Sequence, residues 1–280
     1  MGSDLLSERL SRRESSLVMG IVNVTLDSFA DGGRFNEAAA AVSHAADLVA
    51  EGADILDVGG ESTRPGAAGV SVNEELDRVI PVIERLTREF DVPVSVDTSK
   101  PIVMSEAVAA GAQMINDVCA LESEDALATA ARLGVPVCLM HMRGNPRSMQ
   151  AAPSYDNVTV EIIDYLRTRI DTSLAAGIDA HDIIIDPGFG FGKTLEHNLQ
   201  LLRELEHLVG LGYPVLVGLS RKSMLGTMTS RDVDDRLAGS LALALLAAQN
   251  GAAIIRVHDV APTVDVLRVL GCMAREHGVQ

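Results

Sequence analysis

The chain has 280 residues, of which 47 % are apolar and 22 % charged, and its formal net charge is −16. An acidic chain of this kind repels nucleic acid and anionic membrane surfaces, so neither is an expected partner. Aromatic residues make up only 3 %, with no Trp. We therefore expect an aliphatic core, as is found where helices cover a parallel sheet.

The cysteines and the N-terminal residues indicate where the protein works. Cys119, Cys138 and Cys272 are widely spaced and suit neither a disulfide framework nor a CxxC metal site. No apolar run approaches the roughly 18 residues that a membrane-spanning helix needs. The polar segment 1–16 lacks the apolar stretch of a signal peptide. We therefore expect a cytoplasmic protein.

Apolar runs and helical patterns alternate along the chain. The apolar runs are nearly continuous, which is typical of strands buried on both faces; they lie at 17–24, 54–60, 92–99, 113–118, 135–142, 182–188, 213–220 and 252–259. The helical patterns lie at 36–52, 71–90, 101–110, 124–133, 157–176, 195–209, 234–250 and 262–277. In the second of these, Ser71 precedes Glu74 by three residues, the spacing of a capping box.

Eight strand–helix units with no change of composition predict one α/β domain. The expected architecture is a (β/α)8 TIM barrel over residues 17–280, with residues 1–16 as a polar N-terminal extension. A doubly wound open sheet is the alternative, because it also alternates strands with helices.

Polar side chains stand where each apolar run ends. A single one is readily explained as a helix cap or a turn, but all eight runs end in this way. The carboxyl ends of barrel strands meet on one rim, where barrel enzymes place their active sites. These residues are Asn23, Asp57, Asp97, Asn116, Asp117, His141, Asp186, Ser220, Arg221, Lys222, Arg256, His258 and Asp259.

The strand-end residues divide by charge around the expected barrel. Asp97, Asn116 and Asp186 suit a heterocycle with several N–H and ring-nitrogen sites, because carboxylates accept and an amide does both. The last two strands supply Lys222, Arg256 and His258, where barrels often bind phosphate. Arg64 could add a cation from the loop after the second strand. The sequence therefore indicates a ligand with a polar ring and a phosphate group.

The segment 188–194, GFGFGKT, is similar to a phosphate-binding P-loop but has the wrong spacing. A P-loop needs four residues between its glycines, and three separate Gly188 from Gly192. We therefore do not expect a nucleotide to bind there.

Motifs at all eight strands closely resemble those of the dihydropteroate synthases of folate biosynthesis. They read MGIVNVTLDSFADGG (19–33), DVGGESTRPGA (57–67), SVDTSKP (95–101), INDV (115–118), MHMRGNP (140–146), DPGFGFGK (186–193), GLSRKS (218–223) and RVHDV (256–260). The resemblance implies a transferase that joins p-aminobenzoate to a dihydropterin methyl diphosphate with release of diphosphate. It also implies Mg2+ as cofactor, a homodimer, and sulfonamides as inhibitors.

The resemblance assigns a role to each site residue. The pterin would be bound by Asp97, Asn116, Val118, Met140, Asp186 and Lys222. The diphosphate would be bound by Asn23, Arg64, Arg256 and His258, with Asn23 also the Mg2+ ligand. The p-aminobenzoate would be bound by Phe29, Thr63, Arg64, Pro65, Phe191, Ser220 and Lys222. The residues expected to carry catalysis are Lys222, Arg256, His258 and Asp97.

Two other functions are compatible with a pterin-binding barrel. A methyltransferase that moves a methyl group from a folate to a corrinoid would share the acidic and amide site, but it has no diphosphate to bind. The cations at Arg64, Lys222 and Arg256 argue against it. A non-catalytic paralogue is the other alternative, and the presence of every expected site residue argues against that.

Leu26 and Ala30 depart from the family pattern, which usually has Pro and Ser at these positions. Pro restricts the backbone, so a loop with Leu26 loses more entropy when it orders over p-aminobenzoate. We predict that the Michaelis constant for p-aminobenzoate falls in a Leu26→Pro variant, and equal constants would dismiss the idea. Phe29 and Pro65 match the family, so we expect ordinary sulfonamide sensitivity.

Overall fold

The computed structural model describes residues 6, 8–10, 15–24, 34–62, 66, 69–144 and 149–274, with the backbone alone described at 34–37 and 274. Its centre is a sheet of eight parallel strands in the order β6-β5-β4-β3-β2-β1-β8-β7. The strands are β1 (Leu17–Asn23), β2 (Ile55–Gly59), β3 (Val94–Asp97), β4 (Met114–Asp117), β5 (Val137–Met140), β6 (Ile183–Asp186), β7 (Leu216–Val217) and β8 (Ile254–Val257).

The two end strands of that order, β6 and β7, meet and close the barrel. Ile185 pairs with Val215 in a single parallel bridge, and the Ile185 N–H donates to the Pro214 carbonyl oxygen at 3.0 Å. The prediction of a (β/α)8 barrel is therefore confirmed and the open sheet is wrong. The closure is narrow because β7 has only two residues, fewer than the run at 213–220 predicted.

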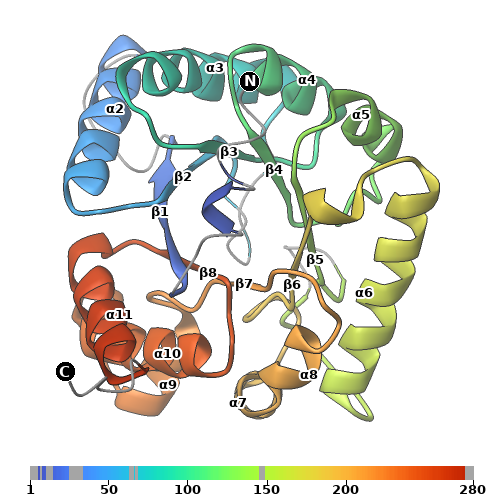
Figure 1. Cartoon of the computed structure of the whole chain (residues 1–280), viewed down its shortest axis with the longest axis vertical. Helices are drawn as coiled ribbons and strands as arrows, with labels where there is room; N and C mark the ends of the chain where they lie inside the picture. Colours follow the sequence, from blue (N-terminus) through green and yellow to red (C-terminus); the bar gives the residue numbers. More distant parts are fainter. Residues whose placement is uncertain are drawn as a thin grey trace, which may run out of the picture.

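The helices form an outer ring around the strands (Figure 1). They are α2 (Arg34–Ala50), α3 (Val72–Glu89), α4 (Pro101–Ala109), α5 (Ala126–Leu133), α6 (Val158–Ala175), α7 (Leu195–Arg203), α8 (Leu205–Val209), α9 (Ser223–Thr229), α10 (Leu237–Gln249) and α11 (Val260–Ala274). The pattern at 195–209 divides into two helices at Glu204, and α9 was not expected. No helix in the described part of the chain is long and apolar enough to cross a membrane.

On four strands the barrel interior changes from an apolar to a polar residue over two positions. Side chains two apart on a strand share a face. Interior apolar residues near the amino ends belong to one buried cluster: Met19, Ile55, Met114, Cys138, Ile184, Leu216 and Ile254. Two residues further along four of these strands stand Asp57, Asn116, Asp186 and Arg256. The strands therefore present an apolar floor and a polar layer above it.

The N-terminal segment closes the amino end of the barrel. Leu6 and Leu10 are buried in the same cluster as the interior floor. Between them, the Arg9 guanidinium lies 3.4 Å from the Asp54 carboxylate and donates to the Asp91 carbonyl oxygen at 3.3 Å. The sequence predicted a polar extension for residues 1–16, but its described leucines are part of the core.

Candidate active site

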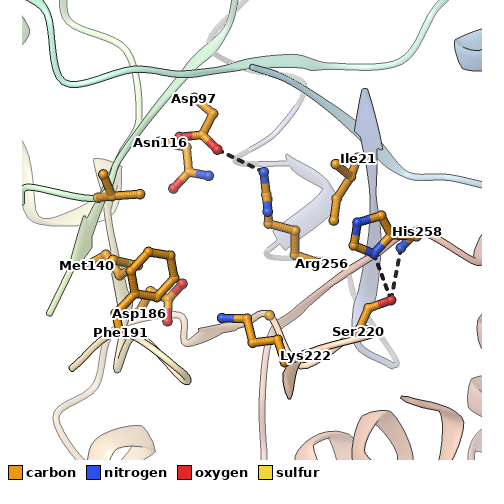
Figure 2. A pocket seen from close by; sticks show the side chains of 12 residues that line it. Ile21, Asp97, Asn116, Met140, Asp186, Phe191, Ser220, Lys222, Arg256 and His258 are labelled. Carbon is orange, nitrogen blue, oxygen red and sulfur yellow. Dashed lines mark hydrogen bonds and ion pairs between the residues drawn. The ribbon is translucent and has the colours of Figure 1, made fainter. Parts of the chain in front are cut away.

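A pocket lies at the carboxyl ends of the strands, where the sequence predicted the active site (Figure 2). It has a volume of about 470 Å3, including space open to solvent. Both apolar and polar side chains line it: Ile21, Asp97, Asn116, Val118, Met140, Asp186, Phe191, Gly218, Ser220, Lys222, Arg256 and His258. Seven of these twelve residues are polar or charged, so the pocket suits a small molecule that carries several polar groups.

Arg256 on β8 connects the acidic and amide residues of the polar layer. Its Nε donates to Asp57 Oδ2 at 2.6 Å, and its second terminal nitrogen donates to Asp97 Oδ2 at 2.9 Å. Asn116 donates to the same Asp57 oxygen at 3.1 Å. Burial by itself would lower the pKa of Arg256, but the carboxylates of Asp57 and Asp97 raise it above its usual value. This guanidinium is therefore charged, and it is fixed by residues from β2 and β3.

Asp97 is a carboxyl group that titrates near neutrality. Burial raises its pKa from 3.8 to about 7, and the neighbouring carboxylates of Asp57 and Asp117 add to that rise while Arg256 opposes it. The strand register places Asp97 between Gly59 of β2 and Asn116 of β4. Gly59 is a close neighbour of the carboxyl, since a Cβ there would lie 3.5 Å from the Asp97 Cβ, an ordinary van der Waals contact.

Lys222 and Asp186 form the opposite part of the pocket. The Lys222 amine donates to the Phe189 carbonyl oxygen and lies 4.6 Å from the centroid of the Phe191 ring. Burial lowers the pKa of Lys222 to about 8, with Asp186 opposing that fall and Arg256 adding to it. Burial also raises the pKa of Asp186, whose Oδ1 accepts the Gly188 N–H at 2.7 Å.

Ser220 and His258 form a pair at the ends of β7 and β8. The Ser220 Oγ lies 3.0 Å from His258 Nδ1 and accepts the His258 backbone N–H at 3.2 Å. The first contact restrains the imidazole ring through Nδ1, and the second holds the serine against the backbone of His258 (Figure 2).

The structure brings most of the predicted site residues together. The pterin set lines the pocket in full, with Asp97 and Asn116 on one side and Lys222 on another. Of the predicted diphosphate and p-aminobenzoate residues, those that line the pocket are Arg256, His258, Phe191, Ser220 and Lys222. Asn23 ends β1 with an exposed side chain and does not line the pocket. Phe29, Thr63, Arg64 and Pro65 lie outside the described residues, as do Leu26 and Ala30.

Three residues near the pocket had no predicted role. Asp57 was noted as a strand end, but its fully buried position under Arg256 and Asn116 was not foreseen. Ile21 and Gly218 line the pocket without carrying a polar group. The sequence could have predicted the position of Ile21. Side chains two apart on a strand share a face, and Ile21 stands two positions after the interior Met19 on β1.

Comparison with known proteins identifies the family. Residues 19–258 match the model of the pterin binding enzymes. The chain is 54 % identical to a dihydropteroate synthase of Escherichia coli over 253 residues, 90 % of each chain. This chain belongs to the dihydropteroate synthase family.

Solved structures of the family agree with that membership. A Yersinia pestis dihydropteroate synthase in complex with a sulfonamide drug has a TM-score of 0.89 and 50 % identity, covering 94 % of this chain and 95 % of its own. A Xanthomonas albilineans dihydropteroate synthase with 4-aminobenzoic acid has a TM-score of 0.89 and 56 % identity, covering 94 % of each chain. The matches support the synthase rather than the corrinoid-dependent methyltransferase.

The shifted pKa of Asp97 predicts how stability depends on pH. Because the folded-state pKa is about 7 and the ordinary value is 3.8, the folded chain holds a proton between these values that the unfolded chain releases. The free energy of unfolding therefore falls as pH rises through this window, by at most about 1.4 kcal/mol per pH unit. In Asp97→Asn this contribution is absent, so urea denaturation between about pH 5 and pH 7 should show a shallower fall.

The matched control is Asp171→Asn, at an exposed carboxyl of α6. It should keep the pH dependence of the unmodified protein. Parallel stability curves for Asp97→Asn and the unmodified chain would contradict the prediction.

Proposed function

We propose that the chain condenses p-aminobenzoate with (7,8-dihydropterin-6-yl)methyl diphosphate, giving 7,8-dihydropteroate and diphosphate in folate biosynthesis. The observation that carries the proposal is that one pocket holds acidic and amide groups together with cations, although the sequence predicted that they would lie apart: Arg256 is paired with Asp97, and the charge of Asp186 acts on Lys222. Asp97, Asn116 and Asp186 line it together with Lys222, Arg256 and His258. A substrate with a polar ring and an anionic leaving group matches both kinds of group, and the family supplies the reaction.

The pterin ring would lie against Asp97, Asn116 and Asp186, with Val118 and Met140 as apolar walls. A carboxylate accepts the paired N–H groups of an aminopyrimidinone, and an amide can donate to a ring nitrogen while it accepts from an N–H. Lys222 would donate to an acceptor of the ring. The carboxylates would also stabilise positive charge on the pterin if its bond to oxygen breaks ahead of attack.

The diphosphate would be bound by Arg256 and His258, together with Asn23 and with Arg64 of the loop after β2. Arg256 has two N–H contacts to Asp57 and Asp97, and a guanidinium has five donors in all. Among the described residues these two contacts are its only hydrogen bonds, which leaves three donors for phosphate oxygens. They stabilise the negative charge that develops as the diphosphate departs.

The p-aminobenzoate would contact Phe191, Ser220 and Lys222, together with Phe29, Thr63, Arg64 and Pro65. Its amine nitrogen attacks the methylene carbon of the pterin substrate, and the bond from that carbon to the diphosphate oxygen breaks. The electron pair leaves with the diphosphate, and the new ammonium then releases a proton. An arylamine is already a nucleophile, so the residues need only position it. Sulfonamides would compete for the same position.

Mg2+ is the cofactor that this site would use. The donor set fits an ion held mainly by substrate, because Asn23 ends β1 with an exposed amide and no cluster of three or more His, Cys, Asp or Glu side chains suited to a metal occurs among the described residues. Mg2+ commonly completes its coordination with water and phosphate oxygens. When bound, it would neutralise charge on the diphosphate.

The test is an assay of diphosphate release that depends on p-aminobenzoate, the pterin substrate and Mg2+. Arg256→Met and Lys222→Met should lower kcat/KM by about 100-fold or more, because each removes a charge that meets the substrate. The control is Arg85→Met, at a surface ion pair with Glu89 on α3, which should leave kcat/KM unchanged. No release from the unmodified chain would overturn the proposal and favour a non-catalytic paralogue.

A homodimer is supported by exposed apolar side chains on α9 to α11 and between them. Of the nine exposed large apolar side chains in the described part of the chain, six lie here: Met228, Val233, Leu237, Leu246, Val269 and Met273. Because α10 contacts both α9 and α11, exposed apolar groups on these helices are available for contact with another chain. The occupant proposed is a second copy of the chain.

Sedimentation tests the dimer. Leu246→Asp with Val269→Asp should shift the protein to monomers, because each places a charge in an apolar contact. The matched control is Ile102→Asp on α4, away from these helices; Ile102 is 57 % exposed, between Leu246 at 46 % and Val269 at 64 %. A monomeric unmodified chain would contradict the proposal.

The proposed location is the cytoplasm. Cys119, Cys138 and Cys272 are all unpaired, and burial raises the pKa of the first two thiols above the usual value. Unpaired cysteines are typical of reducing compartments. Cell fractionation checks the location, and recovery of the protein outside the cytoplasm would contradict it.

A further inference from the structure

Residues 187–192, the glycine-rich loop after β6, pack closely against the end of β5. At Gly188 and Gly192 φ is +68° and +62°, in the left-handed region. A Cβ at Gly188 would overlap the His141 carbonyl oxygen, and one at Gly192 would overlap that of Arg143. These glycines therefore serve a close backbone approach, which is a structural use of a motif that is similar to a P-loop.

Lys193 follows this loop, and its side chain contacts carbonyl oxygens of the loop. Its side chain is 3 % exposed, and its Nζ lies 2.9 Å from the Gly188 carbonyl oxygen and 3.0 Å from that of Phe191. The same Nζ lies 3.0 Å from His141 Nδ1. One amine therefore ties both ends of the loop to the residue that follows β5.

The contacts of Lys193 explain why an amine occupies a buried position. Burial lowers its pKa well below the usual value, and its partners within hydrogen-bond distance among the described residues are carbonyl oxygens and an imidazole. Burial also lowers the pKa of His141 to about 3, so this imidazole is neutral. An apolar side chain of equal length would fill the space, but it would leave buried carbonyl oxygens without donors.

The loop that Lys193 holds provides the surroundings of Lys222. The Lys222 amine donates to the Phe189 carbonyl oxygen and lies over the Phe191 ring. Between these two residues, the missing Cβ of Gly190 leaves room for the Lys222 stem, whose Cδ would lie 3.1 Å from it. A shift of the loop would therefore move the acceptor, the ring and the stem contact together.

We propose that Lys193 is a positioning residue, which fixes the loop at 187–192 and thereby the amine of Lys222 in the substrate pocket. The proposal rests on the proposed role of Lys222 in the synthase reaction. Lys193 itself does not line the pocket. It acts through backbone carbonyl groups, so its own amine does not need to contact a substrate.

A double-mutant cycle tests this positioning role. The variants are Lys193→Met, Lys222→Met and the double variant, each assayed for kcat and for KM of both substrates per folded molecule. Lys193→Met should lower kcat/KM by about 20-fold or more in the native background and by less than about 2-fold in the Lys222→Met background. Equal losses in the two backgrounds would overturn the proposal, because Lys193 would then act independently of Lys222.

A stability control separates positioning from a general loss of fold. Leu86→Ala removes a fully buried side chain near the end of α3, away from the pocket. It should lower stability and leave kcat/KM per folded molecule unchanged. If Lys193→Met does not fold, Lys193→Gln takes its place in the cycle. Its shorter amide cannot reach all three partners of the lysine, so a smaller loss of kcat/KM is expected, and this loss should again be absent in the Lys222→Met background.

The cycle also distinguishes failure of the two proposals. If Lys222→Met alone keeps full activity, the proposed role of Lys222 is wrong. If Lys222→Met is inactive but Lys193→Met and Lys193→Gln keep native kcat/KM, only the positioning role of Lys193 is wrong.

Discussion

The ion pairs of one partly buried guanidinium hold the pocket together. Arg256 lies between Asp57, which is fully buried, and Asp97, whose side chain is 10 % exposed. Two carboxylates this close would repel each other strongly where water is excluded, and the arginine between them offsets that repulsion. Loss of Arg256 would leave both acids without a cation. The fold and the substrate site therefore depend on the same group.

On the side of the pocket formed by Lys222 and Asp186, the amines are held mainly by carbonyl oxygens rather than by ion pairs. Lys222 and Lys193 contact carbonyl oxygens of the loop at 187–192, and Asp186 is the carboxylate whose charge acts on both amines. Carbonyl oxygens hold an amine in place without a full ion pair. With a pKa of about 8, Lys222 can lose or gain a proton near neutral pH. The pKa of Arg256 is raised, so this residue stays charged. The two cations can serve different parts of one substrate.

Prediction from the sequence succeeded where position on a strand decides the outcome. Asp97, Asn116, Asp186 and Arg256 each follow an apolar run, and closure of the barrel gathers such positions on one rim. It did not foresee the part that Asp57 or Lys193 plays. Asp57 contacts Arg256 across 199 positions of the chain, and Lys193 contacts His141 across 52. Local patterns contain no information about which distant side chain a buried group will meet.

The sequence by itself determined the order of elements, the barrel class and the acidic, amide and cationic residues at the strand ends. These are consequences of apolar periodicity and residue type, which act within a few positions. Tertiary structure alone decided that Leu6 and Leu10 complete the barrel floor, and that Arg256 is shared by Asp57 and Asp97. The physical reason is strand register. The pairing of neighbouring strands sets how far along the barrel axis each interior side chain lies, and closure of the barrel then brings side chains at the same level into contact.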